Sequence, residues 1–313
     1  MSFTVLLAAP RGFCAGVERA IRTVELALEA RDADQRPVYV RHEIVHNKVV
    51  VEDLRARGAV FVEDTAEIPQ GATAVFSAHG VSPTVRDEAL ARHLVTLDAT
   101  CPLVSRVHAA VLRYAGRGYT ILFVGHAGHP EVEGVMGEAP ASVKLIQTVQ
   151  DAEQVQVDDP AYVAYATQTT LSVEDVAGIV EVLRRRFPLM VGPEAGDVCY
   201  ATSNRQEAVR ALVEQHGADV VLVLGSPNSS NSNRLREVAE LAGAHAYLLG
   251  TAAELDPTWL EGAARVGVTA GASTPERLVD ALVEELRALG GSEVETVETR
   301  VEDVFFALPP LRR

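Results

Sequence analysis

Residues 4–30 read TVLLAAPRGFCAGVERAIRTVELALEA. The apolar run Thr4–Ala9 predicts a buried β-strand, and the spacing of apolar residues over Val17–Ala30 predicts an amphipathic helix. Cys14 stands in the turn between them. A strand followed by a turn and a helix is typical of an α/β fold with a parallel sheet.

The same alternation of apolar runs and helical patterns continues along the chain. We expect strands at Thr4–Ala9, Val38–Arg41, Ala74–Ser77, Thr120–Val124, Tyr162–Ala166, Val220–Leu224, Ala246–Leu249 and Val266–Thr269. We expect helices at Val17–Ala30, Asn47–Arg57, Pro83–Arg92, Val104–Arg117, Val173–Phe187, Asn204–Gln215, Asn233–Leu241 and Pro275–Leu289. Ser172 and Ser203 are expected as helix N-caps. The fold class is therefore α/β with mostly parallel sheets.

The cysteine-containing turn of residues 4–30 recurs twice. Cys101 and Cys199 also stand at turns that lead into helical patterns. An arginine follows each cysteine at a similar distance, and these arginines are Arg19, Arg106 and Arg205. Such self-similarity indicates related structural units.

Polar loops recur at matching distances after the cysteines. About 30 residues downstream come His46, His129 and Ser229, and roughly 70 residues downstream come His79, Thr169 and Ser273. We expect three similar α/β units in a pseudo-threefold arrangement, at 1–97, 98–195 and 196–290, with a C-terminal tail at 291–313 that packs on the core. Because ligands bind outside the carboxyl ends of parallel strands, these loops are expected to converge on one central site.

Composition excludes several classes of protein. The chain has 313 residues, with 28 basic and 43 acidic side chains and a formal net charge of −15. This balance argues against general binding to nucleic acid or anionic membranes. Three widely spaced cysteines are not a disulfide framework. The sequence has no apolar stretch of 18 residues and no signal-peptide pattern, so a cytoplasmic location is expected.

A buried cysteine is usually a small apolar core residue. These three fit that interpretation poorly, because each stands at a strand-to-helix turn where a thiolate is favoured. A shared metal site is expected. Three thiolates could hold zinc with a histidine as fourth ligand, or a [4Fe–4S] cluster with one iron left open for substrate. Composition does not choose between the two.

Nine segments in the same order resemble the motifs of the 4-hydroxy-3-methylbut-2-enyl diphosphate reductase (IspH/LytB) family. The resemblance extends from about residue 5 to residue 285. The segments are Pro10–Val17, His42–Asn47, Ser77–Val81, Asp98–Val104, Gly128–Gly134, Thr167–Ser172, Val198–Thr202, Asn228–Asn233 and Ala270–Ser273. The tail after Ser292 carries no recognisable motif.

The resemblance implies an iron–sulfur oxidoreductase of the non-mevalonate isoprenoid pathway. Cys14, Cys101 and Cys199 would hold one [4Fe–4S] cluster per subunit, with an open fourth iron. The reaction would be a two-electron reductive dehydroxylation of (E)-4-hydroxy-3-methylbut-2-enyl diphosphate to isopentenyl and dimethylallyl diphosphates. Electrons would come from a ferredoxin or flavodoxin.

The resemblance also implies roles for the polar loops. Glu131 would donate the proton to the leaving hydroxyl, and Thr169 would complete the proton relay. The substrate and its diphosphate would be bound by His46, His79, His129, Thr169, Ser229, Ser230, Asn231 and Ser273. From the residues themselves we expect Glu131 in a loop, because Pro130 disfavours a helical conformation at His129.

Three alternatives stay open. One is another three-cysteine [4Fe–4S] enzyme with three lobes, such as a quinolinate-synthase-like lyase, which would lack the motifs at Gly128–Gly134 and Asn228–Asn233. Another is a non-enzymatic iron–sulfur or zinc sensor, which would have no diphosphate pocket. The third is a zinc hydrolase with a Cys/His site.

Overall fold

The computed structural model describes residues 2–30, 37–193 and 196–310. The chain divides into two compact units. The first consists of Met1–Val17, His46–Val50 and Tyr200–Phe305, and the second of Glu18–Val45, Val51–Cys199 and Phe306–Arg313. No helix among the described residues is long and apolar enough to cross a membrane.

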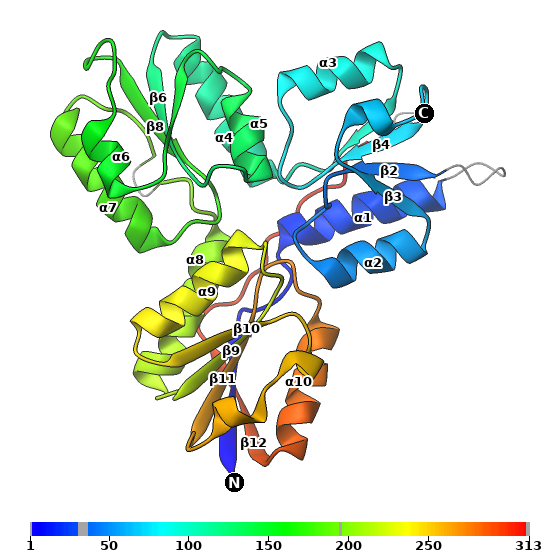
Figure 1. Ribbon diagram of the computed structural model, residues 1–313, viewed down its shortest axis with the longest axis vertical. Coiled ribbons are helices and arrows are strands. Elements are labelled where there is room, and N and C mark those ends of the chain that lie inside the picture. Colours follow the sequence, from blue (N-terminus) through cyan, green and yellow to red (C-terminus); the bar gives the residue numbers. More distant parts are fainter. Residues whose placement is uncertain (1, 31–36, 194–195, 311–313) are drawn as a thin grey trace. The chain divides into compact units, whose positions relative to one another are not determined.

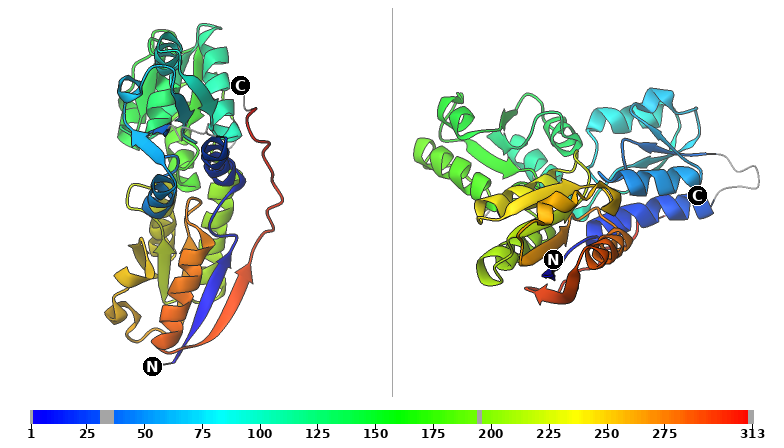
Figure 2. Two further views of the ribbon diagram at one scale, coloured as in Figure 1. Left: turned by 90° about the vertical axis from the view of Figure 1, so that its right-hand side faces the viewer. Right: turned by 60° about the horizontal axis from the view of Figure 1, so that its bottom comes forward.

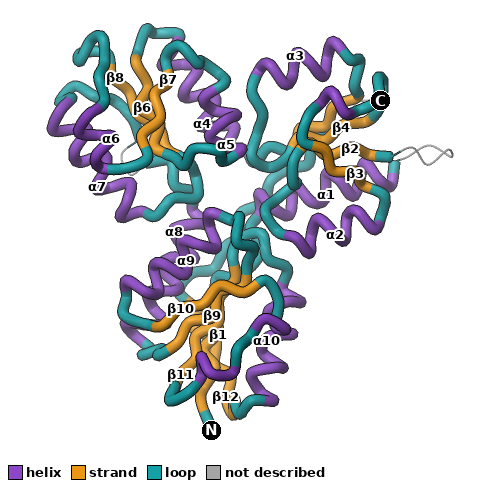
Figure 3. The backbone as a smooth tube through the Cα atoms, viewed as in Figure 1, coloured by secondary structure: helices purple, strands orange, loops and turns teal. Residues whose placement is uncertain are grey.

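Three parallel sheets form the framework of the two units (Figure 3). The first unit holds one sheet in the order β10-β9-β11-β1-β12, with β1 Phe3–Ala9, β9 Val220–Leu224, β10 His245–Leu249, β11 Arg265–Ala270 and β12 Gly291–Glu298. The second unit holds the sheet β3-β2-β4-β5, with β2 Val38–Arg41, β3 Ala59–Val62, β4 Thr73–Phe76 and β5 Val95–Asp98. It also holds the sheet β7-β6-β8, with β6 Thr120–Val124, β7 Val143–Ile146 and β8 Val163–Thr167.

Helices connect these strands. The helices are α1 Ala15–Glu29, α2 Lys48–Ala56, α3 Pro83–Ala91, α4 Pro102–Ala115, α5 Pro130–Met136, α6 Val149–Gln154, α7 Val173–Arg186, α8 Tyr200–Arg210, α9 Ser230–Leu241 and α10 Glu276–Ala288. A π-helical turn, Ala211–Gln215, continues α8. Parallel strands need such crossover connections, because a hairpin cannot join them.

Both faces of the sheet in the first unit are covered by helices (Figure 1). Along β9, Leu222 and Leu224 belong to the core cluster that α10 completes, whereas Val221 and Val223 belong to the cluster formed with α8 and α9. Alternate side chains of a strand point to opposite faces, so a strand covered on both faces must be apolar throughout. This explains the uninterrupted apolar sequence of β9.

The internal repeat is visible in the strand order. Each sheet contains one set of three strands that follow one another in the chain. The first strand of the set lies between the other two, so the order across the sheet is β3-β2-β4, β7-β6-β8 or β10-β9-β11. Every pairing between them is parallel. The prediction of three similar α/β units with parallel sheets is therefore confirmed.

The segment ahead of each cysteine pairs with the third strand of the preceding set. β5 lies beside β4 ahead of Cys101, and Val191 bridges to Ala164 of β8 ahead of Cys199. Ahead of Cys14, β1 pairs with β11, the third strand of the last set. Figure 2 shows β1 beside β12, which follows the last set.

This pairing gives β1 partners from the far end of the chain. Its neighbours β11 and β12 fall within the ranges predicted for the third unit and the tail, although β1 itself falls within 1–97. The tail starts as an edge strand, and Thr299 N donates to Ala9 O at 2.9 Å. Residues 311–313 of the predicted tail lie outside the described residues. The four predicted ranges stay a prediction.

Two local predictions were wrong. Ser203 is not an N-cap, because α8 begins at Tyr200 and Ser203 lies inside it. Glu131 is not in a loop: α5 begins at Pro130, His129 is its N-cap, and Glu131 lies in the first turn. Proline is favoured at the first position of a helix, where its missing N–H is not needed. Ser172 is the N-cap of α7, as predicted, and accepts a bond from Asp175 N.

Candidate active site

Glu131 and Thr169 form a buried pair in the second unit. Thr169 N donates to Glu131 Oε1 at 2.7 Å, and Thr169 Oγ1 donates to Oε2 at 2.9 Å. Glu131 is 1% exposed and Thr169 is 5% exposed. The two residues follow β6 and β8, which are neighbours in one parallel sheet, and so the two loops meet at the carboxyl edge of that sheet.

Burial raises the pKa of the Glu131 carboxyl to about 7, although the two bonds from Thr169 act to lower it. The charge of Asp197 raises this pKa further. A carboxyl group with such a pKa is protonated in a large fraction of molecules near neutral pH. It can therefore deliver a proton to an acceptor, which is the requirement for a general acid.

Two predicted histidines lie close to this pair. His129 Nδ1 accepts a bond from Glu131 N at 3.1 Å, so it caps α5. The rings of His79 and His129 contact edge to face, with centroids 5.5 Å apart. Ser77 Oγ lies 3.2 Å from His79 Nδ1. Glu131, Thr169, His79 and His129 therefore form one connected group.

The three cysteines have equivalent surroundings. Each directly precedes a helix, is partly exposed and is not part of a disulfide. The backbone N–H of each donates to a carbonyl in the loop after a third strand: Cys101 to Ala78 at 3.0 Å, Cys199 to Thr169 at 3.0 Å, and Cys14 to Ala272 at 3.3 Å. Cys199 is thereby joined through Thr169 to the Glu131 pair.

The remaining predicted residues gather in the first unit. Ser273 Oγ donates to His46 O at 3.0 Å, and the side-chain amide of Asn228 lies 3.4 Å from His46 Nδ1. Asn231 Oδ1 accepts a bond from Ala272 N at 2.8 Å, and the carbonyl of Ala272 in turn accepts the bond from Cys14 N. Three polar loops thus meet at the carboxyl ends of β9 and β11.

The run of serines and asparagines forms the start of α9. Ser229 is its N-cap, accepting from Ser232 N at 3.3 Å, and Ser230 is the first residue of the helix. The buried Asn231 Nδ2 is an amide donor with no partner among the described residues. Buried polar groups are normally hydrogen-bonded, so this donor and the helix N-terminus provide binding groups for an anion.

The thiol of Cys14 is influenced by opposing effects. Burial raises its pKa, whereas the positive charge of Arg205 and the backbone N–H groups of Val17 and Gly16 act in the opposite direction. The net effect is a raised pKa. The sequence-based expectation that the helix start favours the thiolate thus describes only the smaller, opposing effect.

Sequence reasoning missed several residues around these groups. Asp197 is buried two residues ahead of Cys199, accepts from Thr167 N at 3.1 Å and raises the pKa of Glu131. Gln168 is fully buried, and its Oε1 accepts from His126 N at 3.1 Å. Gln168 lies within the quoted motif Thr167–Ser172, which could have indicated it, whereas Asp197 had only its closeness to Cys199 in the chain as a signal.

The family of the chain follows from its match to known proteins. Residues 5–287 match the LytB protein family. The chain belongs to this family.

Two relatives match over nearly their whole length. The chain is 57% identical over 305 residues to a protein of Aromatoleum aromaticum, covering 97% of this chain and 96% of the relative. It is 56% identical over 305 residues to a protein of Bordetella pertussis, covering 97% and 92%. Both relatives are named 4-hydroxy-3-methylbut-2-enyl diphosphate reductase.

Two solved structures of reductases have the same fold. The E-1-hydroxy-2-methyl-but-2-enyl-4-diphosphate reductase of Plasmodium falciparum matches with a TM-score of 0.94 and 36% identity, covering 99% of this chain and 96% of that one. A second structure, described as (E)-4-hydroxy-3-methyl-but-2-enyl diphosphate reductase, the terminal enzyme of the non-mevalonate pathway, matches with a TM-score of 0.63 and 31% identity, covering 91% and 99%.

The donor set of the cysteines suits an iron–sulfur group. Three cysteines that form no disulfide stand at equivalent turns, and iron–sulfur clusters are held by cysteine thiolates. Within the ranges that the structure describes, no three His, Cys, Asp or Glu side chains are gathered closely enough to hold a metal ion. Cys14 belongs to the first unit, whereas Cys101 and Cys199 belong to the second. Their convergence on one site stays a prediction.

Proposed function

We propose that this chain is a 4-hydroxy-3-methylbut-2-enyl diphosphate reductase, as its relatives are named. The observation that best supports the proposal is the buried Glu131, whose pKa of about 7 and two bonds from Thr169 suit a general acid. The reaction adds two electrons and two protons to the allylic alcohol, releases water and leaves isopentenyl or dimethylallyl diphosphate.

Cys14, Cys101 and Cys199 would hold one [4Fe–4S] cluster, with the fourth iron open. When bound, the cluster would supply the electrons and a Lewis acid at the substrate hydroxyl. Support comes from the absence of a disulfide at the three cysteines and from the bond of each cysteine N–H to the loop after a parallel strand.

Glu131 would protonate the leaving hydroxyl. Thr169 holds both carboxyl oxygens, so its hydroxyl is placed to pass a proton between the carboxyl group and the substrate. His129 caps α5 through the N–H of Glu131 and so sets the position of the acid. Burial of this pair favours the neutral carboxyl, so a large fraction of it carries the proton that a substrate oxygen can accept.

The diphosphate would be bound by the polar loops. His46, Ser229, Ser230, Asn231 and Ser273 lie in the first unit, and His79 and His129 lie in the second. The donor of Asn231 and the N-terminus of α9 supply neutral donors and a positive dipole end. Binding of this kind is local, as a chain with a net charge of −15 requires.

A ferredoxin or flavodoxin would deliver the electrons, and the cytoplasm is the proposed location. Low-potential donors of this type carry single electrons, so two deliveries would be needed for each turnover.

Metal analysis tests the cofactor directly. Protein purified anaerobically should be brown and hold about four irons per chain. Substituting Cys199 with serine should lower the iron content severely. Wild-type protein prepared in the same way is the control. A colourless protein with stoichiometric zinc after anaerobic reconstitution would reject the cluster and favour the zinc hydrolase or sensor.

A further inference from the structure

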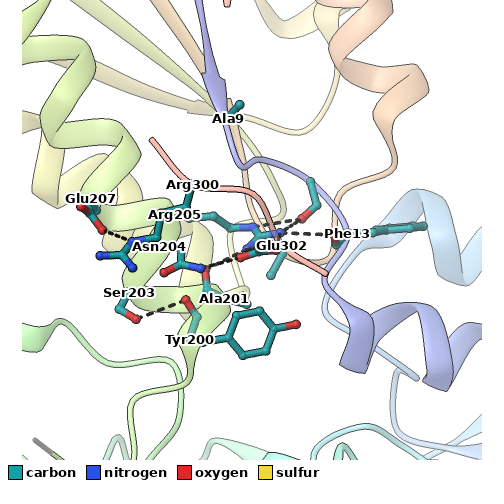
Figure 4. A network of polar contacts seen from close by, with 12 residues as sticks. Ala9, Phe13, Tyr200, Ala201, Ser203, Asn204, Arg205, Glu207, Arg300 and Glu302 are labelled. Carbon is teal, nitrogen blue, oxygen red and sulfur yellow. Dashed lines mark hydrogen bonds and ion pairs between the residues drawn. The ribbon is translucent and has the colours of Figure 1, made fainter. Parts of the chain in front are cut away.

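The arginines that follow the cysteines have a use that the proposed reaction does not account for. Arg205 is fully buried, one turn into α8. Its Nε and Nη2 donate to Gly12 O at 3.1 and 2.8 Å, and Nη2 also donates to Phe13 O at 3.2 Å (Figure 4). Arg205 follows Cys199, yet it holds the two carbonyls directly ahead of Cys14.

Arg19 makes the corresponding contact in the second unit. It lies one turn into α1, the helix that begins directly after Cys14. Its Nη1 donates to Thr100 O at 3.0 Å and its Nη2 to Asp98 O at 3.5 Å. Arg19 thus holds the backbone directly ahead of Cys101.

Arg106 occupies the third equivalent position, on α4 after Cys101. It is exposed, and no hydrogen bond from its side chain to the loop ahead of Cys199 is present among the described residues. Arg205 and Arg19 therefore act in cyclic order: each follows one cysteine and is hydrogen-bonded to the backbone ahead of the next.

The C-terminal tail completes the two hydrogen-bonded sites. Glu302 pairs with Arg205 at 3.0 and 3.2 Å and accepts from Asn204 Nδ2 at 3.0 Å (Figure 4). Five residues later, Ala307 O accepts from Arg19 Nε at 2.8 Å. One segment of extended chain thus reaches both arginines, in the first and second unit respectively.

A buried arginine paired with a carboxylate gives little net stability, because removing both charges from water is costly. Guanidinium groups are useful instead for geometry, since five donors in a rigid plane can hold several acceptors at once. At Arg205 those acceptors are two successive carbonyls beside a cysteine. This arrangement restrains the backbone that carries the thiol.

We propose that Arg205 and Arg19 are positioning residues for the cysteine site, each restraining the backbone ahead of the next cysteine in cyclic order, with the C-terminal tail as their common partner. The inference rests on the proposed function for its purpose, since a cluster with three protein ligands needs three thiols at fixed positions. The hydrogen bonds that make up the restraint are formed by the protein chain itself and do not require a bound cluster.

Hydrogen exchange on the full chain, purified anaerobically, tests the restraint at each loop separately. The reporters are the N–H groups of Gly12 and Cys14, bonded to Ala270 O and Ala272 O, and those of Ala99 and Cys101, bonded to Phe76 O and Ala78 O. Arg19→Gln should speed exchange at Ala99 and Cys101 by about tenfold and leave Gly12 and Cys14 unchanged.

Arg205→Gln should produce the reverse pattern. Because loss of a fully buried arginine could unfold the first unit, Glu302→Gln is the second variant; it should speed exchange at Gly12 and Cys14 in a folded protein. Arg106→Gln, at the equivalent but exposed position, is the matched control and should change neither pair. Equal acceleration at both pairs, or none in any variant, would overturn the proposal.

The reduction potential of the cluster tests separately whether the charge of Arg205 acts at the cysteine site. A positive charge beside a cysteine ligand favours the reduced cluster, so Arg205→Gln should make the potential more negative than Arg205→Lys does. Equal potentials in the two variants would contradict a role for Arg205 at the site. If no cluster forms but the exchange patterns appear, the proposed function fails while the restraint stands.

Discussion

The chemistry of the site depends most on one carboxyl group. Glu131 has almost no exposure, and its pKa is raised from 4.5 to about 7 by burial. Between these two pH values the folded protein binds this proton more tightly than the unfolded chain does. The contribution of Glu131 to the unfolding free energy therefore falls as pH rises from 4.5 to about 7, and it is constant above that pH.

Substituting Glu131 with glutamine should remove the loss of unfolding free energy that the ionised carboxylate causes at high pH. Glutamine keeps the size of the side chain but carries no charge, so the variant should exceed the wild type in unfolding free energy by about 3 kcal/mol at pH 8. The difference should shrink toward zero near pH 4.5. Denaturant unfolding at a series of pH values measures it.

Glu133 provides the matched control for this measurement. It lies two residues further along α5 and is exposed. Glu133→Gln should show the same difference in unfolding free energy between pH 8 and pH 4.5 as the wild type. A Glu131→Gln variant whose stability follows the wild type at every pH would show that the carboxyl group is not held in its neutral form.

At the scale of the element, the start of α9 combines a structural and a binding role. Ser229 caps the helix, and its Oγ also accepts from Ser232 Oγ at 3.0 Å. Ser229→Ala should lower the unfolding free energy by about 1 kcal/mol. It should also weaken binding of inorganic diphosphate, because the hydroxyl and the order of the helix N-terminus are both lost.

Thr148 separates the two effects. It is the N-cap of α6, accepting from Asp151 N at 3.1 Å, and takes no part in the proposed site. Thr148→Ala should cost a similar amount of stability and leave diphosphate binding unchanged in calorimetric titration. Equal weakening of binding in both variants would indicate that Ser229 acts only through the stability of the fold.

Elements differ in how well the sequence predicts them. The central strands β2, β6 and β9 match the expected ranges. The signal is strongest at β9, which is buried along its whole length and is continuously apolar. The strands β3, β5 and β7 were not expected, and all three lie at the edges of their sheets. β5 buries only Leu97, so its sequence carries little of the apolar signal that identifies a strand.

The helix α5 shows a different limit. Pro130 was interpreted as a mark of a loop, but it occupies the first position of the helix, as Pro83 and Pro102 do in α3 and α4. This error changed the predicted site little, because Glu131 still follows β6 at the carboxyl edge of its sheet. The motif order indicated which residues matter, whereas the burial that raises the pKa of Glu131 could be obtained only from the packed structure.

At the scale of the whole molecule, the repeat explains why the two ends of the chain share one sheet in the first unit. The backbone N–H of each cysteine is bonded to the loop after the third strand of one set. β1 satisfies the same rule only by pairing with the last set. The sequence showed the three cysteines and the loops that follow them, but the pairing of the first strand with the last set depends on contacts between chain ends that no local pattern encodes.

The most direct test of the account is turnover under anaerobic conditions. Wild-type protein with (E)-4-hydroxy-3-methylbut-2-enyl diphosphate and a reduced low-potential donor should form isopentenyl and dimethylallyl diphosphates. Glu131→Gln should keep the cluster absorbance and lose nearly all of this activity, whereas Glu133→Gln should keep both. Absence of either product from wild-type protein with a full cluster, or unchanged turnover in Glu131→Gln, would contradict the account.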